Sequence, residues 1–505
     1  MNDKLNSNLI NFLVFFSGLI TCLSFSPFHI SIIALLSIGW LFYTTIYCSP
    51  KKAAWRGYLF GLGYFGSGIS WVFISINTFG FQTSSAILNL LLSGLLTTIF
   101  ICFLSLYIGF SLYISTKFSF NKSILKKAII FSVIWILVEI LRGWMLTGFP
   151  WLYIGYSQTN TFISSLAPLG GIYLVSLSVV IVATFSVLLL VSKNLRLKVK
   201  IVIYILIILS TSLFLKHKSW TTPSNPNNVS VSLVQANISQ NSKWNPDELN
   251  NILKIYDTLT KQNIEPLIFW SENSIPIFPE DIRSYLRYIN DLGIKNNAAI
   301  LVGLPYMDKK TGNYYNAAQV LGYGHGLYLK HQLVPFGEYF PLNKLLGPTL
   351  RFMNIPASNF SAGPKKQPYI LMNKVPVSIF ICYEIAFPEQ VKNQSKSSSV
   401  IAVISDDAWF GNSLGPWQHL QLAQMRAIEN GRYVIQSTND GITAIINQYG
   451  QVTKQLPQFK RAVLTGKVML FEGQTPWQRY GIIPILMLLI LLLIISVQPF
   501  TKQQN

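Results

Sequence analysis

Long apolar runs fill the first 215 residues of the chain and return once near its end. A helix needs about 20 mostly apolar residues to cross the hydrocarbon core of a bilayer. On this criterion the pattern predicts eight membrane-spanning helices, with the last one separated from the others by a long polar segment. The predicted spans lie at 9–25, 28–47, 54–76, 86–114, 124–144, 164–191, 199–215 and 480–497.

Basic residues occur in every second loop between these spans. Clusters of lysine and arginine lie at 51–56, 117–127 and 193–200, whereas the alternate loops at 26–27 and 77–85 carry no basic residue. Cytoplasmic loops are enriched in lysine and arginine, so the alternation predicts that both termini lie in the cytoplasm. The segment 216–479 is then expected on the outer side of the membrane.

A change in composition near residue 216 divides the chain into parts. The Pro/Asn/Ser stretch 222–228 is typical of a linker, and the alternation of apolar and polar residues that begins at Val229 is typical of a strand. We therefore expect a seven-span membrane domain over 1–215, a linker over 216–228, a polar domain over 229–472, and an eighth span with a cytoplasmic tail over 473–505.

Short apolar strands alternate with amphipathic stretches within the polar domain. Strands are expected at 229–235, 266–270, 299–304, 317–323, 375–382, 399–405, 433–438, 442–447 and 462–468, and helices near 246–262, 281–293 and 416–430. Strands mixed with helices over about 240 residues predict a single α/β or α+β domain.

Composition and charge narrow the class of protein. The chain has 505 residues, of which 51% are hydrophobic and only 11% are charged, so a wholly soluble globule is excluded. Its net charge of +20 would suit a nucleic-acid partner. Much of the positive charge lies in the predicted cytoplasmic loops, however, and no nucleic-acid motif is present. We expect the lipid bilayer, and not nucleic acid, as the partner.

Cys382 is the candidate nucleophile. It closes the apolar strand predicted at 375–382, whereas Cys22, Cys48 and Cys102 lie in or beside the N-terminal apolar runs. Outside the cytoplasm paired cysteines tend to form disulfides, but Cys382 has no partner within its own domain. Its thiol therefore stays available as a nucleophile. A small buried side chain without a chemical role is the alternative interpretation.

Two charged residues in other segments complete a candidate site. Glu272 follows the apolar strand predicted at 266–270, and Lys330 precedes a loop rich in proline, phenylalanine and glycine. A cation near Cys382 would favour the thiolate and could stabilise an oxyanion. Taken singly, each of these two residues could equally be a solvated surface charge.

Glu272, Lys330 and Cys382 resemble, in chain order, the Glu–Lys–Cys triad of the carbon–nitrogen hydrolase (nitrilase) superfamily. Longer motifs across nearly the whole chain are similar to those of the apolipoprotein N-acyltransferase family. These motifs are Lys330–Glu338, Cys382–Glu384, Ser405–Gly411, Gly415–His419, Ser437–Thr443 and, in the apolar region, Leu141–Trp151.

The resemblance implies a nitrilase-like αββα sandwich for the polar domain and a multi-pass location in a bacterial inner membrane. It implies transfer of an acyl chain from a phospholipid to the α-amine of the diacylglyceryl-cysteine of an apolipoprotein. The acyl chain would pass through a thioester on Cys382 in a ping-pong mechanism. Neither a metal nor an organic cofactor is implied, and nothing in the sequence demands more than a monomer.

The same resemblance implies a role for each matched residue. Glu272 would be the general base, and Lys330 would stabilise the oxyanion together with the backbone amide that follows Cys382. Residues implied to support the site or bind substrate are Glu338, Tyr383, Glu384 and Trp244.

The chain departs from the family pattern at two positions. Ser271 stands where the family usually has proline, and Asp440 stands where it usually has asparagine. These departures concern local loop geometry and substrate preference. The aromatic-rich segments 336–360 and 409–417 could shield a thioester from water, or could simply belong to the core.

Other interpretations remain open. A membrane-tethered amidase of the nitrilase type would use the same triad. A transporter with a ligand-binding outer domain would be expected to contain broken helices, which the predicted spans lack. Glu139 and Arg142 could pair with each other, or Arg142 could contact lipid head groups or the catalytic domain.

The segment Gly411–Gly415 matches the Gly-x-Ser-x-Gly pattern of serine esterases. Its Ser413 does not directly follow a predicted strand, and Asp406 and His419 lie on either side of it in the sequence. A serine triad of that type requires both partners to follow the serine, so we do not expect one here.

Overall fold

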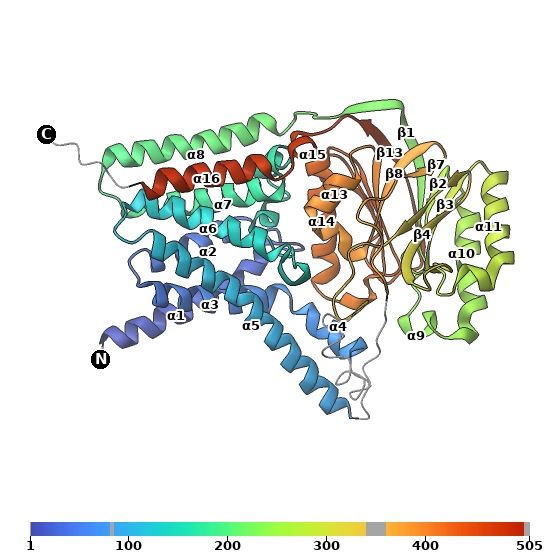
Figure 1. Ribbon diagram of the computed structural model, residues 1–505, viewed down its shortest axis with the longest axis horizontal. Helices are drawn as coiled ribbons and strands as arrows, with labels where there is room; N and C mark the ends of the chain where they lie inside the picture. Colours follow the sequence, from blue (N-terminus) through green and yellow to red (C-terminus); the bar gives the residue numbers. More distant parts are fainter. Residues whose placement is uncertain (1, 81–84, 340–359, 499–505) are drawn as a thin grey trace. The chain divides into compact units, whose positions relative to one another are not determined.

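The computed structural model describes residues 2–80, 85–339 and 360–498 (Figure 1). The chain forms two compact units. One, here called the apolar unit, comprises Met1–Phe73, Leu90–Lys218 and Tyr480–Asn505. The other, here called the polar unit, comprises Ile74–Asn89 and Ser219–Arg479. The short segment Ile74–Asn89, which comes from the N-terminal half of the chain, thus belongs to the polar unit.

Helices make up the apolar unit. Among the described residues, four helices are long and apolar enough to cross a membrane, or five if one bent pair is counted as a single span. Two further apolar helices, α2 and α16, are shorter. The helices that lie wholly or partly in this unit are α1 (Asn2–Thr21), α2 (Ile32–Thr45), α3 (Pro50–Gly68), α4 (Trp71–Phe79), α5 (Ala86–Phe118), α6 (Ile124–Arg142), α7 (Ala167–Val191), α8 (Leu195–Leu215), α15 (Pro476–Tyr480) and α16 (Ile483–Val497).

The third predicted span, 54–76, is not one helix. It consists of α3 and α4, which are bent by 60° relative to each other. The α-helical geometry ends at Ile69, whose φ of −119° and ψ of 26° leave the helical region. Gly68 leaves room for the side chain of Leu152. A β-carbon at position 68 would lie only 2.4 Å from Leu152 Cδ1. The expectation that the spans contain no broken helix is therefore wrong.

Glu139 and Arg142 are buried in the apolar unit and hold the loop that follows α6. The Arg142 guanidinium donates to the carbonyl oxygens of Phe149 (3.0 Å) and Trp151 (2.6 Å). The Glu139 carboxylate accepts from the backbone N–H of Ile154 at 2.8 Å. Arg142 is only 4% exposed, so its hydrogen bonds serve this loop and leave little of it to face a lipid head group.

The polar unit contains two mixed β-sheets. In its described residues the strand orders are β13-β1-β2-β3-β4-β6 and β12-β11-β10-β9-β8-β7-β5. The strands are β1 (Thr222–Gln235), β2 (Leu267–Phe269), β3 (Ala299–Met307), β4 (Tyr314–Gly322), β5 (Gly324–His325), β6 (Leu327–Leu329), β7 (Ile370–Met372), β8 (Val375–Ile381), β9 (Val400–Ser405), β10 (Val434–Thr438), β11 (Ala444–Ile446), β12 (Val452–Gln455) and β13 (Ala462–Glu472).

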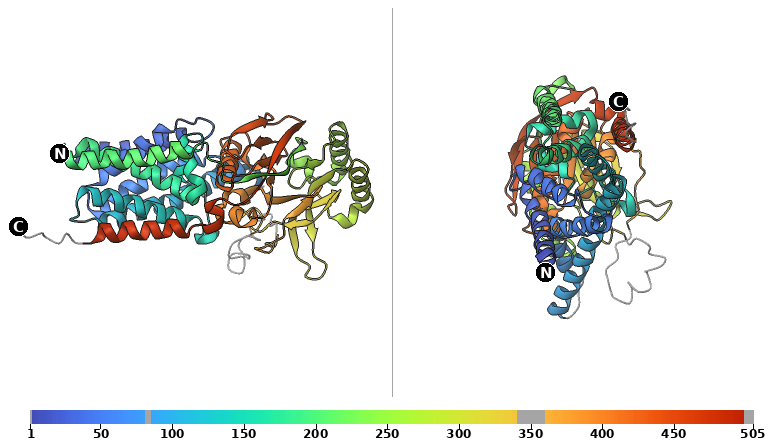
Figure 2. Two further views of the ribbon diagram at one scale, coloured as in Figure 1. Left: turned by 90° about the horizontal axis from the view of Figure 1, so that it is seen from above. Right: turned by 90° about the vertical axis from the view of Figure 1, so that its left-hand side faces the viewer.

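The two sheets pack face to face with helices on their outer faces (Figures 1 and 2). Inward-facing residues such as Leu233 and Phe269 of the first sheet and Ile379 and Ala402 of the second form one buried core. The helices α10 (Leu249–Gln262) and α11 (Arg283–Lys295) cover the other face of the first sheet with a second core. The helices α13 (Pro388–Gln394) and α14 (Gly415–Asn430) pack against the second sheet. Strands β8 and β9 are parallel and covered on both faces, which explains their nearly continuous apolar runs.

Each strand predicted from the sequence has a counterpart, but β1 begins earlier than expected. Thr222 and Pro223 pair with Glu472 and Phe471 of β13, so the stretch 222–228 belongs to a strand and not to a linker. The register shifts between Pro223 and Asn228, where the ladder is irregular. The short strands β5, β6, β7 and β12 and the helix α13 are additional to those predicted.

Strand β3 passes very close to the turn that follows β2. A β-carbon on Gly303 would lie 2.4 Å from the carbonyl oxygen of Ser271, 2.7 Å from the amide nitrogen of Asn273 and 2.9 Å from the Cα of Glu272. All three neighbours are backbone atoms, which cannot rotate out of the way. Only glycine fits here without moving the backbone of residues 271–273.

We expect Gly303→Ala to destabilise the polar unit by about 1–3 kcal/mol, because overpacking forces the backbone to shift. Thermal unfolding of the detergent-purified protein measures this as a lower midpoint. Gly66→Ala in α3 is the matched control, since an added methyl group there meets nothing within 4 Å outside its own helix. Equal midpoints for the Gly303 variant and the wild type would contradict the close approach of the two segments.

Candidate active site

Glu272 lies just beyond the end of β2 and is 5% exposed. Its Oε1 accepts hydrogen bonds from Asn316 Nδ2 at 2.7 Å and from Lys330 Nζ at 3.1 Å. Its Oε2 accepts from the backbone N–H of Asp406 at 3.0 Å. Three donors from three different segments therefore fix both oxygens of this carboxylate.

Local contacts hold the turn that carries Glu272. Ser271 Oγ and Tyr256 Oη lie 2.8 Å apart, and Ser274 Oγ donates to the carbonyl oxygen of Gly303 at 3.0 Å. These bonds tie the turn to α10 and to β3. Ser271 thus contributes a hydrogen bond to the support of this turn.

Lys330 follows β6 and is 1% exposed. Its Nζ donates to Glu338 Oε1 at 2.8 Å as well as to Glu272, and Asn316 Nδ2 donates to the same Glu338 oxygen at 2.9 Å. Burial by itself lowers the pKa of Lys330, but the carboxylates of Glu272 and Glu338 raise it well above its usual value. Lys330 is therefore a permanently charged ammonium between two carboxylates.

Cys382 follows β8 at a sharp turn of the chain. Its φ is +54°, in the left-handed region that residues other than glycine seldom adopt. Strain of this kind is common where a functional side chain must be presented in one direction. The residue is 8% exposed. It is the first residue of a short 3₁₀ helix over Cys382–Ala386.

The electrostatic surroundings of Cys382 favour the neutral thiol. Burial raises the pKa of Cys382 well above its usual value, and the negative charge of Glu272 raises it further. Lys330 acts in the opposite direction and lowers the pKa of the thiol. A base is therefore needed to form the thiolate, and Glu272 is the carboxylate whose charge acts most strongly on Cys382.

Glu384 is fully buried and connects the Cys382 turn to the segment after Lys330. Its two oxygens accept hydrogen bonds from the hydroxyl of Tyr328, the side chain of Gln390 and the backbone N–H groups of His331, Gln332 and Ile381, at 2.7–3.1 Å. Burial raises the pKa of Glu384, while the backbone donors oppose that rise. Glu384 thus positions the strand ends on which Lys330 and Cys382 lie.

Two other predicted residues lie at the edge of this cluster. The ring of Tyr383 packs edge-on against Phe387, with their centroids 5.0 Å apart. Trp244 is 54% exposed, and its indole N–H donates to Gln240 Oε1 at 3.2 Å. None of the hydrogen bonds described for Trp244 reaches Glu272, Lys330 or Cys382.

Sequence reasoning gave no role to several residues that hold the cluster together. Asn316 bridges Glu272 and Glu338 from inside β4, where nothing in the sequence distinguishes it from Gln319 of the same strand. The Asp406 carboxylate accepts from Gln240 Nε2 at 2.6 Å and from Lys243 Nζ. Because the backbone N–H of Asp406 binds Glu272, these contacts also fix the general-base candidate.

Asp440 occupies the second position at which the chain departs from the family pattern. Burial, together with the negative charges of Asp406 and Asp407, raises the pKa of Asp440 to about 8. At neutral pH the side chain is therefore mostly uncharged.

The Gly-x-Ser-x-Gly segment has a local structural role. Ser413 Oγ donates to the carbonyl oxygen of Phe410 at 2.7 Å and accepts from the backbone N–H of Gly415 at 3.1 Å. These bonds close the turn that leads into α14. They engage the hydroxyl in local backbone contacts.

Of the two aromatic-rich segments, the structure describes 409–417 in full and 336–360 only at its ends. Most of 336–360 lies outside the described residues, so its predicted role as a cover stays untested. In the other segment, the ring of Trp409 packs at a tilt against Phe79 with ring centroids 4.4 Å apart, and Ser75 Oγ donates to the carbonyl oxygen of Trp409 at 2.6 Å. Both partners belong to the part of the polar unit that comes from α4.

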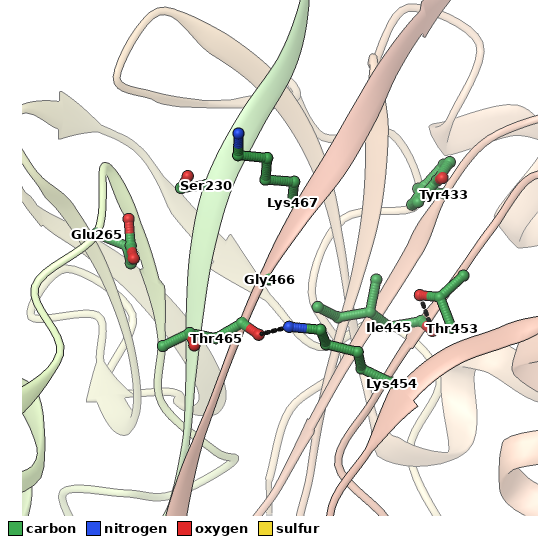
Figure 3. Close-up of a pocket in the computed structure, with 9 residues that line it drawn as sticks. All are labelled: Ser230, Glu265, Tyr433, Ile445, Thr453, Lys454, Thr465, Gly466 and Lys467. Carbon is green, nitrogen blue, oxygen red and sulfur yellow. Dashed lines mark hydrogen bonds between the residues drawn. The ribbon is translucent and has the colours of Figure 1, made fainter.

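A separate hollow of about 520 Å³ lies over β1 and β11–β13 (Figure 3). Lys454 Nζ crosses it to the carbonyl oxygen of Thr465 at 3.0 Å. Its lining contains none of the predicted site residues. In the described part of the chain, no group of three histidine, cysteine or acidic side chains is arranged to hold a metal ion.

Two family models match this chain. Residues 17–185 match the apolipoprotein N-acyltransferase N-terminal domain, and residues 230–474 match the carbon-nitrogen hydrolase family. The apolipoprotein N-acyltransferase of Coxiella burnetii is 39% identical over 486 residues, which are 96% of this chain and 99% of that protein. That of Azotobacter vinelandii is 38% identical over 492 residues, covering 96% of this chain and 94% of that protein.

Among solved structures, the Saccharomyces cerevisiae protein Nit3, a member of branch 10 of the nitrilase superfamily, covers 55% of this chain and 96% of its own. The identity is 17% and the TM-score is 0.37.

The opposing effects of Glu272 and Lys330 on Cys382 predict opposite changes in thiol reactivity. Glu272→Gln removes a negative charge that raises the pKa of the thiol, so alkylation of Cys382 by iodoacetamide at pH 7 becomes faster. Lys330→Met removes a positive charge and makes alkylation slower. Each unit of change in the pKa alters the thiolate fraction about tenfold.

Mass spectrometry of the peptide that contains Cys382 follows this reaction separately from the other cysteines. Glu265→Gln, in the hollow of Figure 3, is the matched control for loss of a carboxylate and is expected to leave the rate unchanged. Slower alkylation in Glu272→Gln would contradict the proposed electrostatics of the thiol.

Proposed function

This chain belongs to the apolipoprotein N-acyltransferase family, and on that premise we propose how its residues carry out acyl transfer. The protein is an acyltransferase of lipoprotein biosynthesis that acts on lipoprotein and lipid substrates. The observation that supports the mechanism most directly is the buried hydrogen-bonded cluster of Glu272, Lys330, Glu338 and Asn316, whose charges act on the Cys382 thiol.

In the first half-reaction Glu272 accepts the proton of the Cys382 thiol as the sulfur attacks the ester carbonyl of a phospholipid. The carbon–oxygen bond of the ester then breaks. The proton passes from Glu272 to the leaving oxygen, and a lysophospholipid departs. The acyl chain remains on Cys382 as a thioester, so the energy of the original ester bond is kept without ATP.

The attack places a negative charge on the former carbonyl oxygen. Lys330, whose ammonium is held by Glu272 and Glu338, stabilises this oxyanion. The backbone N–H of Tyr383, directly after the nucleophile, is the second donor. A fixed cation in a site from which water is largely excluded needs little rearrangement during the reaction.

In the second half-reaction the α-amine of the diacylglyceryl-cysteine of an apolipoprotein attacks the thioester. Glu272 takes the proton from the amine, the carbon–sulfur bond breaks, and the sulfur leaves as a thiolate that is reprotonated to restore the thiol. The product is an amide. The two substrates use one acyl-enzyme in turn, which is a ping-pong mechanism.

Glu384 supports this chemistry by fixing the ends of the strands that carry Lys330 and Cys382. Glu338 shares Lys330 with Glu272 and so keeps the ammonium in place. We assign Tyr383 and Trp244 to substrate binding, since Tyr383 adjoins the nucleophile and the exposed indole of Trp244 is available to an apolar ligand.

We further propose that the protein crosses the inner membrane eight times as a monomer, with the catalytic domain on the outer side and both termini inside. The distribution of basic residues supports this orientation. The shorter helices α2 and α16 would each complete a span together with neighbouring residues.

Intact mass spectrometry tests the acyl-enzyme. Detergent-purified protein incubated with phospholipid is expected to gain the mass of one acyl chain, which neutral hydroxylamine removes. The gain is expected to be absent in Cys382→Ala and retained in Ser413→Ala, the matched change of the other candidate nucleophile. A wild-type protein that gains no mass while the lipid stays intact would contradict acyl transfer and leave the nitrilase-type amidase.

The topology makes a second prediction. With the 4 native cysteines replaced, a membrane-impermeant maleimide is expected to label Lys309→Cys in intact spheroplasts. Lys193→Cys is expected to be labelled only after permeabilisation. Both positions are exposed in their own units, so access across the membrane decides the result. Labelling of Lys193→Cys in intact cells would rule out the proposed orientation.

A further inference from the structure

A histidine without a role in the mechanism above contacts the backbone of the nucleophile. His419 lies in the first turn of α14 and is completely buried. Its Nε2 lies 3.1 Å from the carbonyl oxygen of Cys382, and its Nδ1 lies 3.2 Å from Asp407 Oδ1. Ser405 Oγ donates to the same Asp407 oxygen at 2.7 Å and holds that carboxylate in place.

The contacts of the ring define its protonation. Nε2 faces a carbonyl oxygen, which can only accept a hydrogen bond, and Nδ1 lies at ion-pair distance from a carboxylate oxygen, so the two contacts favour a hydrogen on both ring nitrogens. Burial by itself lowers the pKa of His419, but Asp407 and the Cys382 carbonyl outweigh burial and raise it. These contacts thus favour the charged form of the His419 ring, and the Asp407 carboxylate lies where it balances that charge.

The carbonyl that accepts from His419 belongs to a particular peptide unit. The C=O of Cys382 and the N–H of Tyr383 are parts of one planar group, on opposite sides of the same peptide bond. A hydrogen bond that fixes the direction of the oxygen also fixes the direction of the N–H. A cation at the oxygen end polarises the unit and strengthens the N–H as a donor.

We propose that His419, held by Asp407 and Ser405, orients and polarises the Cys382–Tyr383 peptide so that its N–H stabilises the oxyanion together with Lys330. His419 is a positioning residue, because it acts on the reacting atoms only through this peptide. The proposal rests on the proposed function, in which that N–H is an oxyanion donor.

The left-handed φ of +54° at Cys382 gives this contact a second effect. A strained backbone relaxes unless its surroundings hold it. The bond from α14 to the carbonyl of the strained residue keeps the turn in the conformation in which thiol and amide are presented together. Loss of the bond would therefore misdirect the N–H as well as weaken it.

Two reactions of the same sulfur distinguish this role from a general structural one. Acylation of Cys382 by phospholipid passes through an oxyanion, whereas alkylation by iodoacetamide does not. We expect His419→Leu to slow single-turnover acylation about 100-fold, comparable to the loss of one oxyanion donor. Alkylation at the same pH is expected to change less than threefold, a bound set by the absence of an oxyanion in that reaction.

His419→Gln is the conservative variant. Its amide nitrogen can donate to the Cys382 carbonyl without a positive charge, so acylation is expected to recover only in part, to a rate about tenfold below that of the wild type. His325→Leu, at an exposed position of β5, is the matched control and is expected to leave both rates unchanged. If His419→Leu fails to fold, the comparison of His419→Gln with the wild type decides, with a selective loss in acylation expected.

Acylation at the wild-type rate in His419→Leu, or in His419→Gln when the leucine variant does not fold, would overturn the proposal. A parallel fall of acylation and alkylation would also overturn it, because a damaged turn would affect both reactions. The variant Cys382→Ala tests the proposed thioester separately from the proposed role of His419. Acylation that persists in Cys382→Ala would refute the thioester itself, whatever the His419 variants do.

Discussion

The hydrogen bonds to the Glu272 carboxylate are the constraint on which the catalytic cluster depends. The carboxylate is bound by Asn316 of β4 and by Lys330, which follows β6. It is also bound by the backbone N–H of Asp406, which follows β9. Removing these groups from water is costly unless each is paired, so the two sheets must meet in a single relative position for all three bonds to form. The close passage of Gly303 past the backbone of Glu272, between the neighbouring strands β2 and β3 of the first sheet, fixes the turn that carries this carboxylate. The packing of the two sheets and the position of the Glu272 carboxylate therefore depend on the same contacts.

The cluster also shows why several charges can be buried so close together. Lys330 lies between two carboxylates, and His419 is balanced by Asp407, so each buried cation has an acidic partner. The carboxylate without a cation of its own, Glu384, is instead surrounded by five hydrogen-bond donors. Breaking such an arrangement by removing one partner is far more harmful than the net contribution of the pair would indicate. The thiol is thus placed in surroundings whose charges are set before any substrate arrives.

Much of the fold follows from the sequence because parallel, doubly covered strands such as β8 and β9 are continuous apolar runs. The strands that escaped prediction, such as β5 and β7, have two or three residues and lie near the edge of a sheet, where no periodicity develops. The break after Gly68 was missed because apolar residues continue through it. Cys382 and Glu272 could be proposed because each follows an apolar strand that the sequence predicts. Lys330 was proposed from the motif Lys330–Glu338, since the short strand β6 ahead of it escaped prediction. Asn316 and His419 could not, because they lie inside a strand and a helix, and their partners are 44 and 37 residues away in the chain.

The contact of Ser75 and Phe79 with Trp409 has a consequence for how the protein can be divided. Trp409 lies in the turn between Asp406, whose backbone N–H binds Glu272, and the helix that carries His419. The residues that pack on this turn come from α4, ahead of most of the apolar chain, and not from the sequence around it. A cut after Lys218 would therefore release a catalytic domain without one of its own pieces. The polar unit is discontinuous in sequence, and its C-terminal portion alone lacks the residues that pack on this turn.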